Sequence, residues 1–227
     1  MPLLSENQLN WSAVVANSRM NRERNASGVN SYEQEFKFKP EEFLEQQIQR
    51  SGFVSWLDLC CGQGNALIQS AEFLAGKELQ HKARLKGIDL LDAFRKRDDR
   101  LTCLDFEPVP LAGWKPDRKY DLITCVHGLH YIGDKLRIIE TALTALAEDG
   151  LFIANLDLQN IRINGKDASV FLKKQFAAHG IDYHTRSKII RRKSTLVVEL
   201  GLKFLGSDDT TGPNYTGQEA VTSHYSQ

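Results

Sequence analysis

The sequence predicts an α/β protein whose core is a doubly wound, mostly parallel β-sheet. Along most of its 227 residues, short apolar segments typical of buried strands alternate with amphipathic helical segments. This alternation is typical of crossover units in a parallel sheet that helices cover on both faces. Toward the C-terminal end, two strand-like segments follow one another without a helix between them. Such a hairpin places one antiparallel strand at an edge of the sheet.

The first strand and its helix begin at residue 53. Residues 53–59 have the composition of a buried strand and run into a turn with two glycines. Leu67, Ala71 and Leu74 then recur at the spacing of one helix face, and Gly76 is expected to end that helix. By the same reasoning we expect strands at residues 85–89, 101–105, 120–126, 151–156, 189–190 and 195–205, and helices at residues 134–147 and 167–179.

Both ends of the chain differ from this alternating pattern. Residues 1–50 are expected to form an N-terminal helical extension or lid, with Pro40 at the first position of a helix. Within it, residues 17–32 are polar, and a disordered arm and a solvated helix both remain open. Residues 51–206 would form the main domain, and residues 207–227 a polar tail rich in turn formers.

The composition disfavours several classes of protein. Lys plus Arg and Asp plus Glu both number 29, so no net charge attracts nucleic acid or acidic membranes. No apolar run approaches the ~18 residues that cross a bilayer, and the first residues lack the pattern of a signal peptide. The four cysteines form no CxxC motif, which favours buried free thiols in a reducing cytoplasm over disulfides or a metal site. We therefore expect a cytoplasmic protein without a metal.

The turn after the first strand, Gly62-Gln-Gly64, is a candidate ligand site. Glycines let a backbone approach a ligand closely, and the start of the following helix offers free N–H groups. On its own, this turn is equally consistent with a purely structural role. Leu67 stands where the dinucleotide-binding pattern has its third glycine, which disfavours a nicotinamide dehydrogenase.

Acidic residues stand at or near the ends of the first three expected strands. Asp58, beside the glycine turn, would repel a pyrophosphate but attract an ammonium or sulfonium group. Asp89, at the end of the second strand, can accept hydrogen bonds from ribose hydroxyls. Asp105 can accept from an adenine amino group, and the ring of Phe106 can stack on the base. Together these residues indicate a pocket for a cationic adenosine ligand.

These residues give the sequence a resemblance to the class I S-adenosylmethionine-dependent methyltransferases. The segment WLDLCCGQGNA at residues 56–66 resembles the first motif of the family, LDLGCGTG, although Cys60 replaces its first glycine. The segments YDLITCVHGLHY at residues 120–131 and EDGLFI at residues 148–153 resemble the fourth strand with its loop and the turn into the fifth strand. The resemblance covers about residues 53–156.

The resemblance implies a seven-stranded sheet with an antiparallel last strand, and S-adenosylmethionine as the cofactor. It also implies that the side chain of Cys60 points away from the ligand. The residues expected to contact the cofactor are Asp58, Cys60, Gly62, Gly64, Asp89, Leu90, Asp105, Phe106 and His127.

Candidate catalytic residues follow the fourth strand. A histidine side chain titrates near neutrality, so His127 and His130 could act as a base, although each could equally serve the backbone or the packing. Tyr131 is expected to form a wall of the pocket. Tyr32 is the third catalytic candidate, placed near the reacting centre if residues 17–32 fold over the cofactor. A solvated arm or a dimer contact is the alternative for that segment, which also carries Arg19, Met20, Arg22 and Arg24.

The loop after the fourth strand, Cys125-Val-His-Gly, lacks the Asn/Asp-Pro-Pro-Tyr/Phe sequence found in methyltransferases that modify adenine N6 or a glutamine amide. The leading interpretation is therefore methyl transfer to an oxygen or nitrogen of a small molecule or short peptide. One alternative is a tRNA or protein methyltransferase recruited through the basic residues 188–193. Another is a non-catalytic subunit that binds the same cofactor, and a homodimer is possible.

Overall fold

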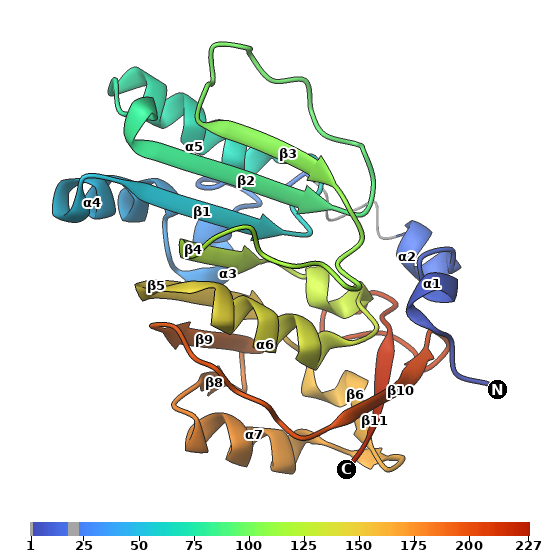
Figure 1. Cartoon of the computed structure of the whole chain (residues 1–227). Coiled ribbons are helices and arrows are strands. Elements are labelled where there is room, and N and C mark those ends of the chain that lie inside the picture. Colours follow the sequence, from blue (N-terminus) through green and yellow to red (C-terminus); the bar gives the residue numbers. More distant parts are fainter. Residues whose placement is uncertain (1, 18–22) are drawn as a thin grey trace.

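The computed structural model describes residues 2–17 and 23–227, and its centre is a seven-stranded sheet (Figure 1). The strand order is β3-β2-β1-β4-β5-β9-β8. The first five strands in this order, β3, β2, β1, β4 and β5, are parallel to one another, and β9 is antiparallel to both of its neighbours. The strands are β1 Val54–Leu59, β2 Ala83–Asp89, β3 Leu104–Pro108, β4 Tyr120–Cys125, β5 Leu146–Asn155, β8 Asp182–His184 and β9 Ile189–Lys193. The predicted fold class is confirmed.

Helices cover both faces of this sheet. Strand β1 illustrates the two layers, because Val54 and Trp56 pack with α3, α4 and α5, whereas Leu57 and Leu59 pack with α6 and α7. The α-helices are α1 Glu6–Leu9, α2 Ala13–Asn17, α3 Tyr32–Phe36, α4 Pro40–Ser51, α5 Asn65–Gly76, α6 Lys135–Ala145 and α7 Ser169–Ala178. The 3-10 helices are η2 Gln80–Lys82, η3 Gly128–Tyr131 and η4 Leu158–Asn160. None of the helices in the described ranges is both long and apolar enough to cross a membrane.

The predicted helix near residues 134–147 shows how local sequence determines an element. The side chain of Asp134 caps α6 by accepting a hydrogen bond from the backbone N–H of Arg137. Leu136, Ile139 and Leu143 follow at the spacing of one helix face, and all three are buried in the core. α6 therefore agrees closely with the prediction.

The hairpin at the sheet edge lies earlier in the chain than predicted. Residues 195–205 were expected to pair with residues 189–190, but β9 pairs instead with β8, Asp182–His184. Residues 195–200 form an extended segment along α6, where the N–H of Leu196 donates to the carbonyl of Leu143. An alternating apolar pattern fits either a strand or an extended segment packed on a helix, so the pattern alone could not distinguish them.

A second, four-stranded sheet was not predicted. Its order is β10-β11-β6-β7, and it joins residues that follow β5 to the polar tail. The strands are β6 Ile161–Ile163, β7 Lys166–Asp167, β10 Lys203–Asp208 and β11 Thr222–Ser226. On the edge of β10, Leu4 forms two backbone hydrogen bonds with Ser207, of 2.8 and 2.9 Å. This sheet therefore anchors both the tail and the beginning of the N-terminal extension.

A buried lysine fastens the second sheet to the main domain. Lys135, at the start of α6, is fully buried, and its ammonium group donates to the carbonyls of Ile132 and Val221 and to the hydroxyl of Ser223. Burial lowers the pKa of Lys135 to about 7. The three hydrogen bonds connect the loop before α6 with β11.

Candidate functional site

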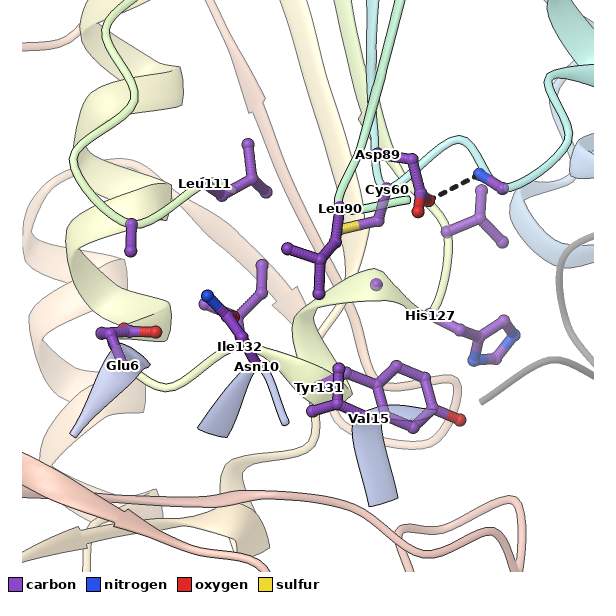
Figure 2. Close-up of a pocket in the computed structure, with 14 residues that line it drawn as sticks. Glu6, Asn10, Val15, Cys60, Asp89, Leu90, Leu111, His127, Tyr131 and Ile132 are labelled. Atoms are coloured by element: carbon purple, nitrogen blue, oxygen red, sulfur yellow. Dashed lines mark hydrogen bonds between the residues drawn. The ribbon is translucent and has the colours of Figure 1, made fainter. Parts of the chain in front are cut away.

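A narrow cavity of about 100 Å³ lies at the carboxyl ends of the central strands. In Figure 1, α1 and α2 lie beyond the arrowheads of β1 and β2, and residues of both helices close this cavity. Figure 2 shows Glu6 and His127 at opposite ends of the row of lining residues. The lining residues are Glu6, Asn10, Val15, Cys60, Gly62, Asp89, Leu90, Leu111, Ala112, Val126, His127, Gly128, Tyr131 and Ile132.

Asp89 ties the glycine turn to the end of β2. Its carboxylate accepts hydrogen bonds from the backbone N–H of Gly62, at 2.9 Å, and from that of Leu91, at 3.2 Å. Gly62 has a φ of 61°, a left-handed conformation that favours glycine. The side chain of Asp89 is largely buried and still lines the cavity, next to Leu90. The structure thus brings Gly62, Asp89 and Leu90 together, as the sequence analysis expected.

Cys60 occupies the position of the first glycine of the motif. Its φ is 57°, so a cysteine here adopts the backbone conformation that a glycine would take more easily. Its side chain lines the cavity and lies against Gly128, where an added Cβ would stand only 2.3 Å from the Cβ of Cys60. The contact with Cys125 and burial raise the pKa of the Cys60 thiol, so this wall of the cavity is uncharged. The direction of the Cys60 side chain relative to the cofactor stays a prediction.

Gly64 and Phe106 pack against each other beside the cavity and do not line it. Gly64 caps the start of α5 with a φ of 77°, and an added Cβ would lie 2.3 Å from the ring of Phe106. That ring also stacks on Phe94, with the centroids 4.8 Å apart and the planes inclined by 12°. In this structure Phe106 covers the glycine turn.

Asp105 is not brought to the cavity. The third strand runs from Leu104 to Pro108, so Asp105 lies near its beginning, whereas residues 101–105 were expected to end at the ligand site. Asp105 is exposed and lines a shallow depression together with Ala83 and Arg118, at the amino ends of the strands. The strand was misplaced by about three residues because Leu101 and Cys103 are apolar and buried although they precede the strand.

Asp58 is fully buried one layer behind the cavity and does not line it. Its carboxylate accepts a hydrogen bond of 2.6 Å from the hydroxyl of Thr124 and one of 2.7 Å from that of Tyr32. The indole N–H of Trp56 donates to the same Thr124 hydroxyl, at 2.8 Å. Burial raises the pKa of Asp58 to about 7, against the opposing effect of the two hydrogen bonds.

The catalytic candidate Tyr32 therefore lies in the core, where its ring packs edge-on against Phe36 and Trp56. It does not line the cavity. The part of the extension that closes the cavity is α1 and α2, through Glu6, Asn10 and Val15. Of the other residues named in the predicted lid, Arg19, Met20 and Arg22 lie outside the described residues.

His127 stands at the end of the cavity nearest α3. Its φ is 56°, and its backbone N–H donates to the side-chain oxygen of Asn155 at 3.2 Å. The Nε2 atom of its ring lies 3.2 Å from Oε1 of Glu35, at an angle that falls short of a hydrogen bond. Arg24 contacts the same Oε1 at 2.8 Å. The interaction with His127 lowers the pKa of Glu35, and Arg24 adds to this effect, so Glu35 is ionised at neutral pH.

Tyr215 from the tail completes a group of three rings with His127 and His130. Its centroid lies 6.2 Å from that of His127 and 5.6 Å from that of His130. Its hydroxyl accepts a hydrogen bond of 3.1 Å from Asn155, and its backbone N–H donates to Asp157. Burial raises the pKa of Tyr215 to about 12. The tail, left undecided by the sequence, therefore returns to the ends of β4 and β5.

His130 is enclosed within this group. It is 1% exposed, and neither ring nitrogen has a hydrogen-bond partner among the described residues. Burial lowers the pKa of His130 well below its usual range, so the ring is neutral. His130 does not line the cavity, whereas its neighbour Tyr131 does, as expected.

The charge of the cavity wall suits a cation. The carboxylates of Glu6 and Asp89 line it, and no Lys or Arg occurs among the described residues that do so. No group of three or more potential metal ligands occurs within residues 2–17 and 23–227.

Among the residues near the site that were not predicted are Glu6, Glu35 and Asn155. Asn155 could have been found, because it ends the fifth strand and the ends of parallel strands share one edge. Glu6 and Glu35 belong to short helices whose position depends on contacts with distant residues. No local pattern identifies them.

Comparison with known proteins gives one match to a protein family. The family model described as "Methyltransferase domain" matches residues 22–191. No curated protein matches the sequence.

Several solved structures are similar to parts of the chain. The plantazolicin methyltransferase BpumL, in complex with a pentazolic desmethylPZN analogue and SAH, is 23% identical over 50% of this chain and 44% of its own, with a TM-score of 0.38. The sugar N-methyltransferase KedS8 from Streptoalloteichus sp. ATCC 53650 is 21% identical over 51% and 46%, with a TM-score of 0.38. Residues 961–1257 of StiE, an O-MT, are 17% identical over 63% and 52%, with a TM-score of 0.45. This chain spans about half the length of each.

Proposed function

Because this chain belongs to the family of S-adenosylmethionine-dependent methyltransferases, we propose that it transfers a methyl group from S-adenosylmethionine to an oxygen or nitrogen of a small molecule or short peptide. The observation that carries the proposal is the position of Asp89. This acid ends β2, is hydrogen-bonded to the glycine turn after β1 and lines the cavity. An acid at this place can accept hydrogen bonds from the hydroxyls of a ribose.

The residues around the cavity fit a cationic nucleoside. Asp89 accepts hydrogen bonds from the N–H groups of Gly62 and Leu91 and lines the cavity, where an acid at a strand end can also accept from ribose hydroxyls. Leu90 and Leu111 offer apolar surface to an adenine, and Cys60 borders the glycine turn on the side of the methionine end. The wall carries carboxylates and no Lys or Arg among its described residues, which favours a sulfonium.

The N-terminal helices are proposed to act as the lid of this site. The cavity of about 100 Å³ is smaller than the ~300–1,000 Å³ of typical small-molecule sites. A nucleoside therefore needs α1 and α2 to move outward, because Glu6, Asn10 and Val15 close the cavity on that side. This assignment moves the lid from residues 17–32 to residues 2–17.

Methyl transfer requires mainly that the protein position the acceptor next to the methyl group. The cofactor supplies an activated methyl group, and holding an acceptor close and in line can contribute ~7–11 kcal/mol at best. A base is needed only when the acceptor atom carries a proton at neutral pH. His127 is the candidate base that lines the cavity, whereas His130 and Tyr32 lie behind the wall.

The basic segment at residues 188–193 gives little support to the tRNA or protein alternative. Lys188 lies 3.8 Å from the buried carboxylate of Asp157. Arg192 donates to the backbone carbonyls of His179 and Gly180. Lys188 and Arg192 are therefore engaged in contacts within the protein at the sheet edge. This agrees better with a small acceptor than with a macromolecule bound through these charges.

The proposal is tested by calorimetry with S-adenosylmethionine, followed by incubation of the protein with methyl-labelled cofactor and a cell extract. Label in the low-mass fraction supports the proposal. Label in acid-precipitable material would favour a macromolecular acceptor. Binding without transfer into either fraction would favour the non-catalytic subunit, and absence of binding would refute the assigned cofactor.

A further inference from the structure

The contact between His127 and α3 has a chemical consequence that rests on the proposed function. We infer that Glu35 is the positioning residue of His127, and that this pair selects acceptors that must lose a proton during transfer, namely hydroxyl groups and ammonium groups. The geometry that points to this role is the 3.2 Å separation between Nε2 of His127 and Oε1 of Glu35.

Glu35 is itself held in place. Arg24 donates to Oε1 at 2.8 Å, and the side chains of both residues are largely shielded from solvent. The backbone N–H of His127 is fixed on the other side by Asn155. The backbone hydrogen bond to Asn155 and the 3.2 Å separation of Nε2 from the carboxylate keep the imidazole close to the orientation that the base of an oriented pair requires.

This arrangement assigns separate tasks to the two ring nitrogens. Nε2 is buried against Glu35, whereas Nδ1 receives no hydrogen bond from any described residue. A proton on Nε2 that faces a carboxylate leaves the lone pair on Nδ1. Nδ1 is therefore the atom available to take a proton from an acceptor in the cavity that His127 lines.

An ammonium group first gives a proton to His127, which frees the nitrogen lone pair, whereas a hydroxyl loses its proton as it attacks. The lone pair of the acceptor oxygen or nitrogen forms the new bond to the methyl carbon, and the carbon–sulfur bond breaks with its electrons going to sulfur. The proton of the acceptor passes to Nδ1, and the imidazolium that results lies against the ionised Glu35. An acceptor without a proton to lose gains nothing from this pair.

Other charged and titratable groups also face His127. They are Arg24 from the N-terminal extension, His130 from η3 and Tyr215 from the tail. Arg24 opposes a positive charge on His127, whereas the Glu35 carboxylate, which lies next to both residues, favours it. The pH dependence of the rate is therefore expected to respond strongly to Glu35.

The experiment compares Glu35→Gln with wild type, using methyl-labelled S-adenosylmethionine and the low-mass fraction of a cell extract as acceptor source. We expect at least a tenfold lower rate, an unchanged cofactor affinity, and an acid limb of the pH–rate profile that moves to lower pH. The double variant with His127→Gln should be no slower than His127→Gln alone, because Glu35 acts through His127. Glu35→Asp keeps the charge and should recover part of the rate.

Glu33→Gln is the matched control, since Glu33 lies on the same helix but contacts Lys39 and the backbone of Gly28. It should transfer at the wild-type rate. Equal rates and profiles for wild type and Glu35→Gln, or additive losses in the double variant, would overturn the inference and leave the proposed function standing. Wild-type protein that binds the cofactor without transferring methyl would overturn both.

Discussion

The residues around Asp89, at the carboxyl end of β2, come from two short stretches of sequence, whereas His127, after β4, contacts residues from three distant ones. Asp89 and the Gly62 turn are joined by hydrogen bonds between consecutive strands of one sheet. His127, by contrast, meets Glu35 of the extension, Asn155 at the end of β5 and Tyr215 of the tail. The Asp89 end of the site follows from local sequence. The His127 end forms only when distant segments of the chain have folded together.

From this difference we propose that the selectivity for the acceptor resides at the His127 end of the site. A fold can keep one ligand-binding frame while its added segments change the second substrate. Here the added segments, the N-terminal extension and the tail, both reach the His127 end of the site. Variants at the two ends should therefore have separable effects, on cofactor binding at one end and on transfer at the other.

The largest expected effect concerns the layer behind the cavity. Asp58 has a pKa of about 7 in the folded protein and an ordinary value of 3.8, so the folded state holds an extra proton between pH 4 and 7. The free energy of unfolding must then fall as pH rises through this window. Relative to wild type, Asp58→Asn should gain stability between pH 4.5 and pH 8, by about 3 kcal/mol.

Urea denaturation of both proteins at the two pH values measures this change. The wild type and the variant share every other titrating group, so their difference isolates Asp58. A difference that stays constant from pH 4.5 to pH 8 would show that Asp58 is ionised throughout.

The next effect is on cofactor binding. Asp89→Ala should weaken the binding of S-adenosylmethionine by about 1–3 kcal/mol, because the hydrogen-bond partners of the acid are left unpaired. Asp105→Ala is its matched control, because Asp105 is exposed and lies at the opposite end of the strands. Calorimetry should give the wild-type affinity for the control, and equal losses in both variants would contradict the placement of the ribose.

The smallest expected effect is on the rate of methyl transfer and tests the His127 end of the site separately from the Asp89 end. Tyr215→Phe removes the hydroxyl that accepts from Asn155 but keeps the ring beside His127 and His130. We expect a rate of methyl transfer about tenfold lower, equivalent to about 1.4 kcal/mol, with cofactor affinity unchanged. Labelled transfer and calorimetry on the same preparation measure both, and a loss of affinity alone would move Tyr215 to the cofactor end.

The sequence predicted the central sheet well because its strands carry their own signal. Buried parallel strands such as residues 54–59 are almost continuously apolar, and helices such as α6 bring their own cap and apolar face. The second sheet carries no such signal. Its strand β11, Thr222–Ser226, is mostly polar, and Tyr225 becomes buried only because β10 and β6 lie beside it.

The candidate site divides in the same way. Gly62 and Asp89 were found because they stand at fixed positions relative to two strands. Tyr32 was placed at the reacting centre because it lies in a polar segment, but its hydroxyl is satisfied by Asp58 in the core. Glu35, three residues further along the same helix, is the residue of this segment that contacts His127.

The backbone hydrogen bonds between Leu4 and Ser207 couple the position of α1 to that of the C-terminal tail. Ser207 belongs to β10, which precedes the loop carrying Tyr215, and Leu4 belongs to the segment before α1. Glu6 of α1 also accepts a hydrogen bond from the backbone N–H of Asp134. An outward swing of α1 large enough to admit a nucleoside must strain or release these attachments. Under the proposed function, we therefore expect that binding of the methyl donor on the α1 side shifts the loop that carries Tyr215.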